Sequence, residues 1–420
     1  MKSLMLLWKT LAQECASLCH ISANLDIQTV QMRYEHEGFQ FLAVTLPRFA
    51  KDLERALEQG KVTPYLFCGF HRRGELPVLL GGFMERVFNR ETAVLLDKPC
   101  GDSIYAIRQL SLVFGKMQPP GRHPGEAAAL QEFVKCEQEV DEADRSIDRD
   151  RIQRFSRMSN LLYRDVFTDL ANAIYGRKIL PGHGPGNTAD RIRGNAKFDQ
   201  TEWTERLESV FPFADYAIPS YGFYYRRNAV HFLEPGAERP SRVVAVPKTY
   251  KTPRIIALEP TCMQFMQQGV LHHMVPVMEQ DSFLSPFVGF THQEPNQLMA
   301  REGSLHGELA TLDLSEASDR VSYRHVMECI GENFPLVREA VDAVRSMKAD
   351  VPGHGVIHLS KFASMGSAIC FPFEEMVFLA IIFSSIEQKL STSFTRREIK
   401  SFAGSVRVYG DDIIVPVEHV

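Results

Sequence analysis

Residues 406–417 read VRVYGDDIIVPV, two runs rich in β-branched residues separated by Gly410 and Asp411. A two-residue connection of this kind is typical of a tight β-hairpin, so the stretch predicts a hairpin with Asp411 and Asp412 at its tip. An acidic pair at a turn is common on protein surfaces. The hairpin alone therefore does not decide between a catalytic and a structural role.

A second stretch, upstream of the hairpin, predicts a partner strand. Residues 308–315, ELATLDLS, alternate apolar and polar side chains, which is the period of a half-buried strand. Asp313 emerges on the polar face at the end of this strand. Ser315 is expected to cap a following helix that contains Asp319, and the turn would bring Asp319 back toward the same site.

The acidic side chains gain a chemical meaning if the predicted strand lies beside the hairpin. Asp313, Asp411 and Asp412 would then converge, and hard oxygen ligands in that number suit Mg²⁺, which takes its remaining ligands from water and substrate phosphates. Two such ions roughly 3.5–4 Å apart activate an attacking hydroxyl and stabilise the leaving oxygen in phosphoryl transfer. Without a cation, the same acids would repel one another.

Between the strand and the hairpin lies a loop of small residues that leads into an apolar run. Residues 364–385 read SMGSAICFPFEEMVFLAIIFSS, which is compatible with a buried helix behind a glycine-containing start. Alternatively, Ser364, Gly366 and Ser367 leave room for a backbone and a ribose to approach closely. Pro372 predicts either a kink or a helix that starts late.

Positive charge is concentrated in residues 226–254, which hold seven Lys or Arg against two Glu in a chain whose formal charge is −5. Within them, residues 242–258 predict two short strands joined by a proline-containing turn. The cations on or beside this hairpin are either ordinary solvent-facing side chains or a clamp for a triphosphate, and the pattern favours neither. They are Lys248, Lys251 and Arg254.

Two further segments stand out by composition. Residues 180–195, LPGHGPGNTADRIRGN, contain too many Gly, Pro and Asn for a helix or a central strand, and predict a long ordered loop of functional importance. Residues 137–157 are dense in Asp, Glu and Arg, and predict an exposed helix or connector.

Overall composition limits the classes of protein to consider. A chain of 420 residues with 45% hydrophobic content predicts two or three globular units, and its eight scattered cysteines favour free thiols over a zinc site. The longest apolar run, residues 376–383, is far shorter than the ~20 residues of a membrane span. We therefore expect a soluble protein whose nucleic-acid contacts, if any, come from local patches.

Taken in order, TLDLSEASD at 311–319, SMGSAICFPFE at 364–374 and YGDD at 409–412 resemble motifs A, B and C of viral RNA-directed RNA polymerases. The chain looks most like the replicase β subunit of levivirus-like positive-strand RNA bacteriophages. VPKTYKTPRIIALEP at 246–260 is similar to motif F of that family. IRQLSLVFGK at 107–116 and GHGPGNTADRIRGN at 182–195 extend the resemblance toward the N-terminus.

The resemblance implies roles for individual residues. The motif A and C aspartates would bind two Mg²⁺ ions, for which Mn²⁺ may substitute, while Asp319 would recognise the incoming ribose hydroxyl. Ser367 stands where better-known phage replicases carry Asn. The metal-binding and catalytic residues implied are Asp313, Asp411 and Asp412, and the nucleotide-binding residues implied are Lys248, Lys251, Arg254, Asp319, Ser364, Gly366 and Ser367.

The fold implied is a right-hand polymerase of α+β class with an antiparallel palm sheet backed by helices. Residues 1–260 would form the N-terminal and fingers region, including the motif F hairpin at about 242–258. Residues 261–420 would form the palm with inserted fingers segments, and the catalytic core would begin at about 298. Because the family continues with motifs D and E and a thumb, the chain looks truncated after motif C, which puts the activity of the 420-residue chain by itself in question.

The activity implied is RNA-templated RNA synthesis, in which a 3′-hydroxyl attacks the α-phosphate of a nucleoside triphosphate and pyrophosphate leaves. The partners implied are RNA template and product, nucleoside triphosphates and, as in some relatives, the host elongation factors Tu and Ts. No membrane association is expected. The implied location is the cytoplasm of an infected bacterial host.

Two alternatives remain open. A reverse transcriptase also places paired aspartates on a tyrosine-containing hairpin, but that family excludes ribose with a bulky aromatic residue five positions after its motif A aspartate. Here that position is Ser318, which favours ribonucleotides. A non-catalytic RNA-binding palm scaffold would be marked by loss of an acidic ligand, and all three are present.

Overall fold

The computed structural model describes residues 2–117, 123, 125–250 and 252–420, and they form two compact units. Unit 1 comprises residues 1–129 and 246–254. Unit 2 comprises residues 130–245 and 255–420. Each unit has a hydrophobic core of its own.

Unit 1 is mainly helical. Its core includes Trp8, Phe49 and Phe67, and the indole Nε1 of Trp8 donates a hydrogen bond to the carbonyl oxygen of Leu110 at 2.8 Å. Its elements are α1 (Lys2–Leu18), α2 (Asn24–Glu37), a π-helical turn (Phe41–Thr45), α3 (Leu46–Glu58), β1 (Arg72–Arg73), β2 (Leu76–Pro77), α4 (Gly81–Met84) and α5 (Gly101–Leu112). The stretch 107–116 therefore lies mostly in α5 of this unit.

Unit 2 is built around the long helix α7 (Arg149–Tyr175), which packs against α10 (Thr261–Gln280), α12 (Tyr323–Ile330), α13 (Pro335–Ala343) and α14 (Cys370–Leu390). The inward face of α7 carries residues such as Met158, Leu162 and Phe167, all fully buried in the core of unit 2. The remaining helices are α6 (Glu126–Ser146, which begins in unit 1), α8 (Glu205–Val210), α9 (Phe213–Tyr216), α11 (Glu294–His306) and α15 (Arg396–Lys400), with 3₁₀ turns at Gly194–Phe198, Tyr221–Ala229, Ser318–Arg320 and Val417–His419.

The strands form small sheets. A four-stranded sheet has the order β6-β5-β8-β9, in which β5 (Ser241–Val246) runs parallel to β8 (Lys348–Val351), and β8 runs antiparallel to β9 (Gly355–His358). Its edge strand β6 spans Arg254–Leu258. A short parallel pair joins β3 (Glu202–Thr204) to β4 (His231–Leu233).

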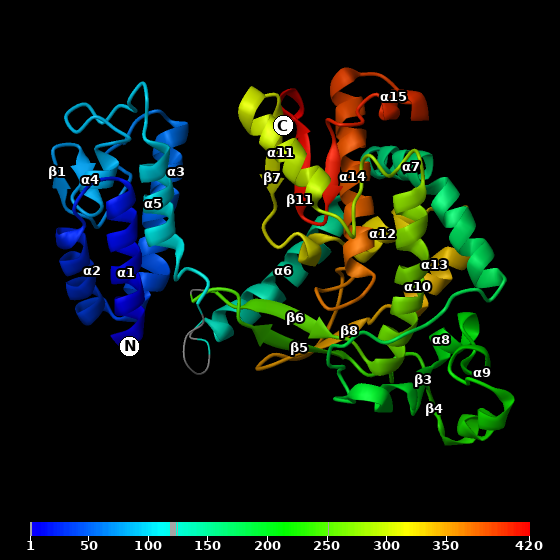
Figure 1. Cartoon of the computed structure of the whole chain (residues 1–420). Coiled ribbons are helices and arrows are strands. Elements are labelled where there is room, and N and C mark those ends of the chain that lie inside the picture. Colours follow the sequence, from blue (N-terminus) through cyan, green and yellow to red (C-terminus); the bar gives the residue numbers. More distant parts are fainter. Residues whose placement is uncertain (1, 118–122, 124, 251) are drawn as a thin grey trace. The chain divides into compact units, whose positions relative to one another are not determined.

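The three-stranded sheet β10-β11-β7 is antiparallel throughout. It contains β7 (Leu309–Asp313), β10 (Arg407–Tyr409) and β11 (Asp412–Pro416). Helix α11 packs against all three strands, and α14 packs against β10, so the sheet lies between these two helices (Figure 1). Buried Ile413 and Val415 join it to the core of unit 2.

Much of the expected local structure is present. The α+β class is confirmed, as are the hairpin at 406–417, the strands of the basic segment and the long loop at 180–195, which contains neither helix nor strand before Gly194. Helix α14 starts at Cys370, so Pro372 lies in its first turn, where its missing N–H has no intrahelical acceptor to lose. The division into fingers and palm stays a prediction.

Two expectations are wrong. No helix follows Ser315, because Glu316 adopts the left-handed conformation with φ +56° and the chain makes a turn and a 3₁₀ segment; the next helix, α12, is capped by Ser322, whose side chain accepts from the N–H of His325 at 3.1 Å. Residues 137–157 are not simply exposed, because Glu137 in α6 and Phe155 in α7 are buried.

The cysteines are all free thiols, and six of the eight are buried, as the scattered spacing predicted. Among the described residues, no helix combines the length and the apolar character needed to cross a lipid bilayer.

Candidate active site

The three-stranded sheet brings the predicted acids to one end. In the antiparallel pairing of β7 with β11, Asp313 lies directly opposite Asp412. Residues opposite each other in such a pair have Cβ atoms about 4.5–5.5 Å apart. Both side chains are exposed, and so is Asp411 in the adjoining turn. The expected convergence of strand and hairpin is therefore present.

The hairpin turn is fixed from inside the protein. Gly410 has φ +59°, and a Cβ at this position would overlap with the ring of Phe371. Its N–H donates to Oε1 of Glu375 at 2.7 Å, and Glu375 is fully buried in α14. Burial raises the pKa of Glu375 well above its usual range, although the Gly410 N–H and the nearby Arg407 oppose that rise.

Arg407 anchors the other end of β10. Its Nε donates to Oδ1 of Asn296 at 2.8 Å, and its Nη1 donates to the carbonyl oxygens of Ser285 and Pro286, both at 2.9 Å. The hairpin is thereby tied to α11 and to the loop before it.

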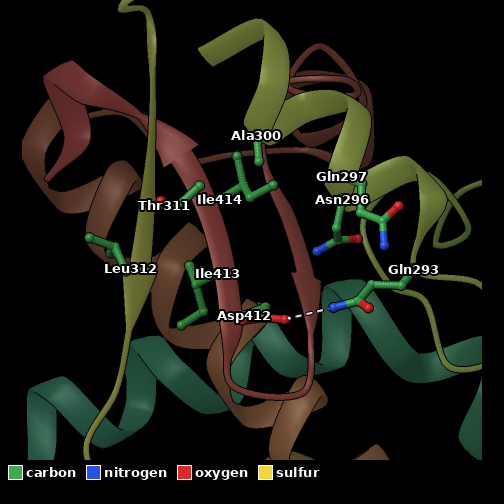
Figure 2. Close-up of a pocket in the computed structure, with 9 residues that line it drawn as sticks. All are labelled: Gln293, Asn296, Gln297, Ala300, Thr311, Leu312, Asp412, Ile413 and Ile414. Carbon is green, nitrogen blue, oxygen red and sulfur yellow. Dashed lines mark hydrogen bonds between the residues drawn. The ribbon is translucent and has the colours of Figure 1, made fainter. Parts of the chain in front are cut away.

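Asp412 is the only one of the three acids with a hydrogen-bond partner among the described residues. Its Oδ2 accepts from Nε2 of Gln293 at 3.0 Å, across one end of a hollow of about 150 Å³ (Figure 2). The hollow is lined by Gln293, Asn296, Gln297, Ala300, Thr311, Leu312, Asp412, Ile413 and Ile414. Asp313 and Asp411 carry neither a hydrogen bond nor an ion pair in the described part of the chain, so their oxygens are free for an external ligand.

The fit to a metal ion rests on this donor set. Exposed carboxylates without a cationic partner are the oxygen ligands that Mg²⁺ prefers. The described residues contain no ready-made group of three or more His, Cys, Asp or Glu placed to hold a metal ion. The three aspartates therefore have the right chemistry and lie at one sheet end, but their oxygens are not already gathered as in a closed metal site.

Asp319 is held by a buried cation. Nζ of Lys361, which is fully buried, lies 3.0 Å from Oδ1 of Asp319 and 3.5 Å from Oε2 of Glu137. The same Nζ lies 3.6 Å from the centre of the Phe133 ring. Breaking a buried pair by removing one partner costs roughly 3–5 kcal/mol. Lys361 therefore fixes the position of Asp319 through contacts with helix α6.

Glu374 is a buried acid near both motif A and motif C. Its Oε2 accepts a hydrogen bond from Oγ of Ser318 at 2.9 Å, whereas its buried Oε1 has no partner among the described residues. Burial, with the charges of Asp411 and Asp319, raises the pKa of Glu374 to about 7, against the lowering effect of Ser318. The side chain of Ser318 is therefore hydrogen-bonded to Glu374, in addition to being too small to exclude a ribose.

The motif B loop packs against the chain itself. Gly366 has φ +122°, and a Cβ there would overlap with the carbonyl oxygen of Ala257 in β6; the N–H of Ala257 donates to the carbonyl of Met365 at 2.8 Å. Oγ of Ser367 donates to Oε1 of Gln267 at 3.1 Å. Ser364 is buried, and its Oγ has no partner among the described residues. The small residues of this loop therefore allow strand β6 to pack closely against it.

The basic segment is less positive than its composition suggests. Three of its arginines are neutralised by acids from elsewhere in the chain, in the pairs Arg226–Asp199, Arg227–Glu208 and Arg239–Glu202. Lys248 and Arg254 are exposed and belong to unit 1, whereas Lys251 lies outside the described residues. Their contact with a triphosphate stays a prediction.

Residues 236–420, which contain the sheet, the acids and the motif B loop, match the family described as RNA replicase, beta-chain. Over this segment, the chain is similar to the RNA replicase beta-chain family. It is 34% identical over 178 residues to the RNA-directed RNA polymerase subunit beta of Enterobacteria phage SP, covering 42% of this chain and 27% of that protein. The resemblance to phage replicases is thereby confirmed.

Two other phage proteins are similar to the same extent. The RNA-directed RNA polymerase beta chain of Escherichia phage MS2 is 33% identical over 176 residues, which is 42% of this chain and 29% of that protein. The subunit beta of Escherichia virus Qbeta is 33% identical over 176 residues, which is 42% of this chain and 27% of that protein. The chain thus matches between a quarter and a third of the length of these curated relatives.

Several residues around the candidate site had no signal in the sequence. Glu374 and Glu375 read as polar flanks of an apolar run, yet both are buried; Glu375 accepts from the hairpin turn at Gly410, and Glu374 accepts from Ser318. Lys361 and Glu137 lie more than 200 positions apart, and only the packing of α6 brings them together. Gln293 precedes α11 without any motif. The one hint in the sequence was the position of Glu374 and Glu375 next to each other near the start of an apolar helix. Acids buried there need hydrogen-bond or charge partners, so they indicate a polar site nearby.

We expect the stability of the Glu374→Gln variant relative to wild type to rise with pH. The pKa of Glu374 is raised from 4.5 to about 7, so its contribution to folding is complete below pH 4.5 and is lost as pH rises through 7. The Gln side chain does not titrate, so the stability of the variant does not include this pH-dependent loss. The difference in free energy of unfolding should shift by about 2–3 kcal/mol in favour of the variant, measured by urea denaturation across this window.

Glu279→Gln provides a control of opposite sign. Burial acts to raise the pKa of Glu279, but hydrogen bonds from Thr291 and the Phe290 N–H outweigh it and lower that pKa. This variant should therefore be least stable, relative to wild type, at neutral pH, and should recover as pH falls below the usual range of Glu. Parallel slopes for the two variants would contradict the assignment for Glu374.

Gly366→Ala should destabilise the protein by about 3 kcal/mol or more, because the new Cβ overlaps with the Ala257 carbonyl and φ +122° is unfavourable for any L side chain. Gly353→Ala is the matched control. Its φ is +82°, but nothing lies within 4 Å of a Cβ there, so about 1–2 kcal/mol is expected. Equal losses in urea denaturation would show that close packing on β6 contributes nothing.

Proposed function

We propose that this chain carries the catalytic acids of an RNA-directed RNA polymerase that replicates a bacteriophage genome. The observation that supports this most directly is the pairing of Asp313 with Asp412 beside Asp411 at one sheet end. It lies within the segment that matches the replicase family. The named activity of the relatives belongs to proteins of which this chain matches only a part, so the activity of the chain is inferred.

In the proposed reaction, Asp313, Asp411 and Asp412 hold two Mg²⁺ ions, or Mn²⁺ in their place. When bound, these ions supply activation of the 3′-hydroxyl and stabilisation of the departing pyrophosphate oxygen. The protein contributes positioning: the sheet register sets the spacing of the carboxylates, and Glu375 holds the turn that presents Asp411. No covalent enzyme intermediate is needed.

The nucleotide-binding roles follow the same proposal. Asp319, fixed by Lys361, accepts a hydrogen bond from the ribose 2′-hydroxyl, while Lys248, Lys251 and Arg254 contact the triphosphate. Ser364, Gly366 and Ser367 shape the loop on which the nascent base pair rests. Because Ser367 and Gly366 are engaged by Gln267 and β6, we assign that loop a positioning role.

We assign residues 1–260 to the N-terminal and fingers region and residues 261–420 to the palm of a right-hand polymerase. The antiparallel sheet between α11 and α14 is the part of unit 2 that fits a palm. Such a polymerase acts on an RNA template with nucleoside triphosphates in the cytoplasm of an infected bacterium. The host elongation factors Tu and Ts are candidate partners by family analogy alone.

A reverse transcriptase is disfavoured by Ser318, which is small and hydrogen-bonded to Glu374. A non-catalytic RNA-binding scaffold is disfavoured by the free oxygens of Asp313 and Asp411, because a scaffold has no need for exposed acids without a counter-charge.

Asp411→Asn should abolish templated ribonucleotide incorporation with Mg²⁺, with a loss on the order of 10²-fold or more, because it removes a charge from the metal ligands. The assay uses the chain joined to the C-terminal part of a full-length relative, on a primed RNA template with host factors supplied. Glu339→Gln, which alters an exposed acid on α13, is the control and should keep activity.

A second readout does not depend on turnover. Titration of the 420-residue chain with Mn²⁺, followed by electron paramagnetic resonance, should show binding that Asp411→Asn weakens and Glu339→Gln does not. Equal Mn²⁺ binding and equal incorporation in both variants would contradict the two-metal proposal.

Asp319→Asn should reduce discrimination between UTP and 2′-deoxy-UTP. The variant loses the charged acceptor for the 2′-hydroxyl, so kcat/KM for UTP should fall roughly 10- to 100-fold while that for the deoxynucleotide changes little. Steady-state kinetics with both nucleotides would measure this. An equal fall for the two nucleotides would assign Asp319 a purely structural role with Lys361.

A further inference from the structure

The loop 182–195 is held in one conformation by buried contacts. Thr188 is fully buried, and Oγ1 of Thr261, at the start of α10, lies 2.9 Å from Oγ1 of Thr188 and donates to Oδ1 of Asp190 at 2.5 Å. The N–H of Ala189 donates to the carbonyl of Glu259 at 2.8 Å. Nζ of Lys197, also buried, donates to the carbonyl of Gly184 at 2.8 Å.

This loop presents two arginines toward a third on β5. A hollow of about 280 Å³ is lined by Asn187, Arg191 and Arg193 of the loop and by Arg242 of the strand, all within unit 2. Pockets for small ligands run from roughly 300 to 1,000 Å³, so this hollow suits a small group. Among the described residues, its lining offers guanidinium and amide donors and no carboxylate.

The three arginines lack counter-charges. None of them forms an ion pair within the described residues, whereas the arginines at 206, 226, 227 and 239 each do. The oxygens of Asp190 are taken by Thr261, and Asp350, the cross-strand neighbour of Arg242, makes no ion pair with it. Nε of Arg242 is buried and has no partner among the described residues.

The backbone of Arg191 is strained. Its φ is +62°, a conformation that costs a side-chain-bearing residue about 1–2 kcal/mol, and its N–H donates to the carbonyl of Thr188 at 3.0 Å. Such strain persists where the surrounding structure imposes it, and it concentrates at ligand sites. Three permanently charged guanidiniums around one hollow repel one another unless an anion lies between them.

We propose that Arg191, Arg193 and Arg242 form a phosphate-binding site, separate from the triphosphate contacts assigned to the basic hairpin. The paired donors of guanidinium match two phosphate oxygens at once, and Asn187 adds an amide donor. The phosphate belongs to an RNA strand or to a nucleoside triphosphate, an assignment that rests on the proposed function. The pinned loop keeps the site formed before the ligand arrives.

The test measures binding without metal or turnover. A fluorescein-labelled 12-nucleotide single-stranded RNA is titrated with the 420-residue chain in EDTA at several KCl concentrations, and ATP is titrated by calorimetry in the same buffer. The test variant is Arg191→Gln with Arg193→Gln. The control is Arg145→Gln with Arg164→Gln, which removes the same charge from two exposed, ion-paired arginines of unit 2.

We expect the test variant to bind RNA about tenfold more weakly than wild type at low salt. The slope of log affinity against log salt should become less steep by roughly 0.7, since the site binds one phosphate and each phosphate neutralised on a single strand contributes about 0.7. The control should stay within twofold of wild type. Arg191→Lys with Arg193→Lys keeps the charge but loses the paired donors, and should fall between the two.

The outcomes separate the sources of phosphate. Weaker RNA binding by the test variant supports a strand site, and weaker ATP binding alone supports a nucleotide site. If neither ligand distinguishes the test variant from the control, the proposal is overturned. If the double variant unfolds, Arg193→Gln alone replaces it, because Arg193 has an extended backbone that any residue adopts. Its RNA binding should be weaker than that of wild type and stronger than that expected for the double variant. Because EDTA removes the metal, failure here leaves the polymerase proposal intact.

Discussion

The register between β7 and β11 is the constraint on which the site depends. With Asp313 opposite Asp412, both acids lie on the exposed side and Ile413 turns into the core. Only the first residue of β11 is exposed and the other four are buried, so a slip toward the exposed end would bring an isoleucine into water and a slip the other way would bury the acid. Burial of Ile413 and Val415 therefore holds the carboxylates in place, and hydrophobic packing rather than any attraction between them sets their spacing.

Behind this sheet end, buried charged residues hold neighbouring segments of the chain in position. Glu375 accepts the N–H of Gly410, Glu374 accepts from Ser318, and Lys361 connects Asp319 to Glu137 on α6. Each is costly to bury alone, and each is tolerated because a hydrogen bond or opposite charge accompanies it. Their shared effect is to fix two short segments, the hairpin turn at Gly410 and the 3₁₀ turn at Ser318–Arg320, that have little regular structure of their own.

Backbone contacts complete the arrangement. The loop before α14 approaches β6 so closely that only glycine fits at 366, and the loop at 182–195 is pinned to the start of α10 by Thr188 and Asp190. Both loops are therefore ordered by their surroundings, although neither has a regular hydrogen-bond pattern. Ordered loops on a rigid scaffold are where proteins commonly bind ligands, and one of these presents arginines that nothing in the described chain neutralises.

The sequence by itself determined the local elements and the acids that matter. The alternation around Asp313, the hairpin with Gly410, the late start of α14 and the family of residues 236–420 all follow from short-range patterns, because strand period, turn chemistry and proline geometry are local. Tertiary structure alone decided that Ser315 caps nothing, that Glu374 is buried, that Lys361 meets Asp319, and that three of the basic-segment arginines are neutralised. Those outcomes depend on contacts between residues distant in the chain, which no local pattern encodes.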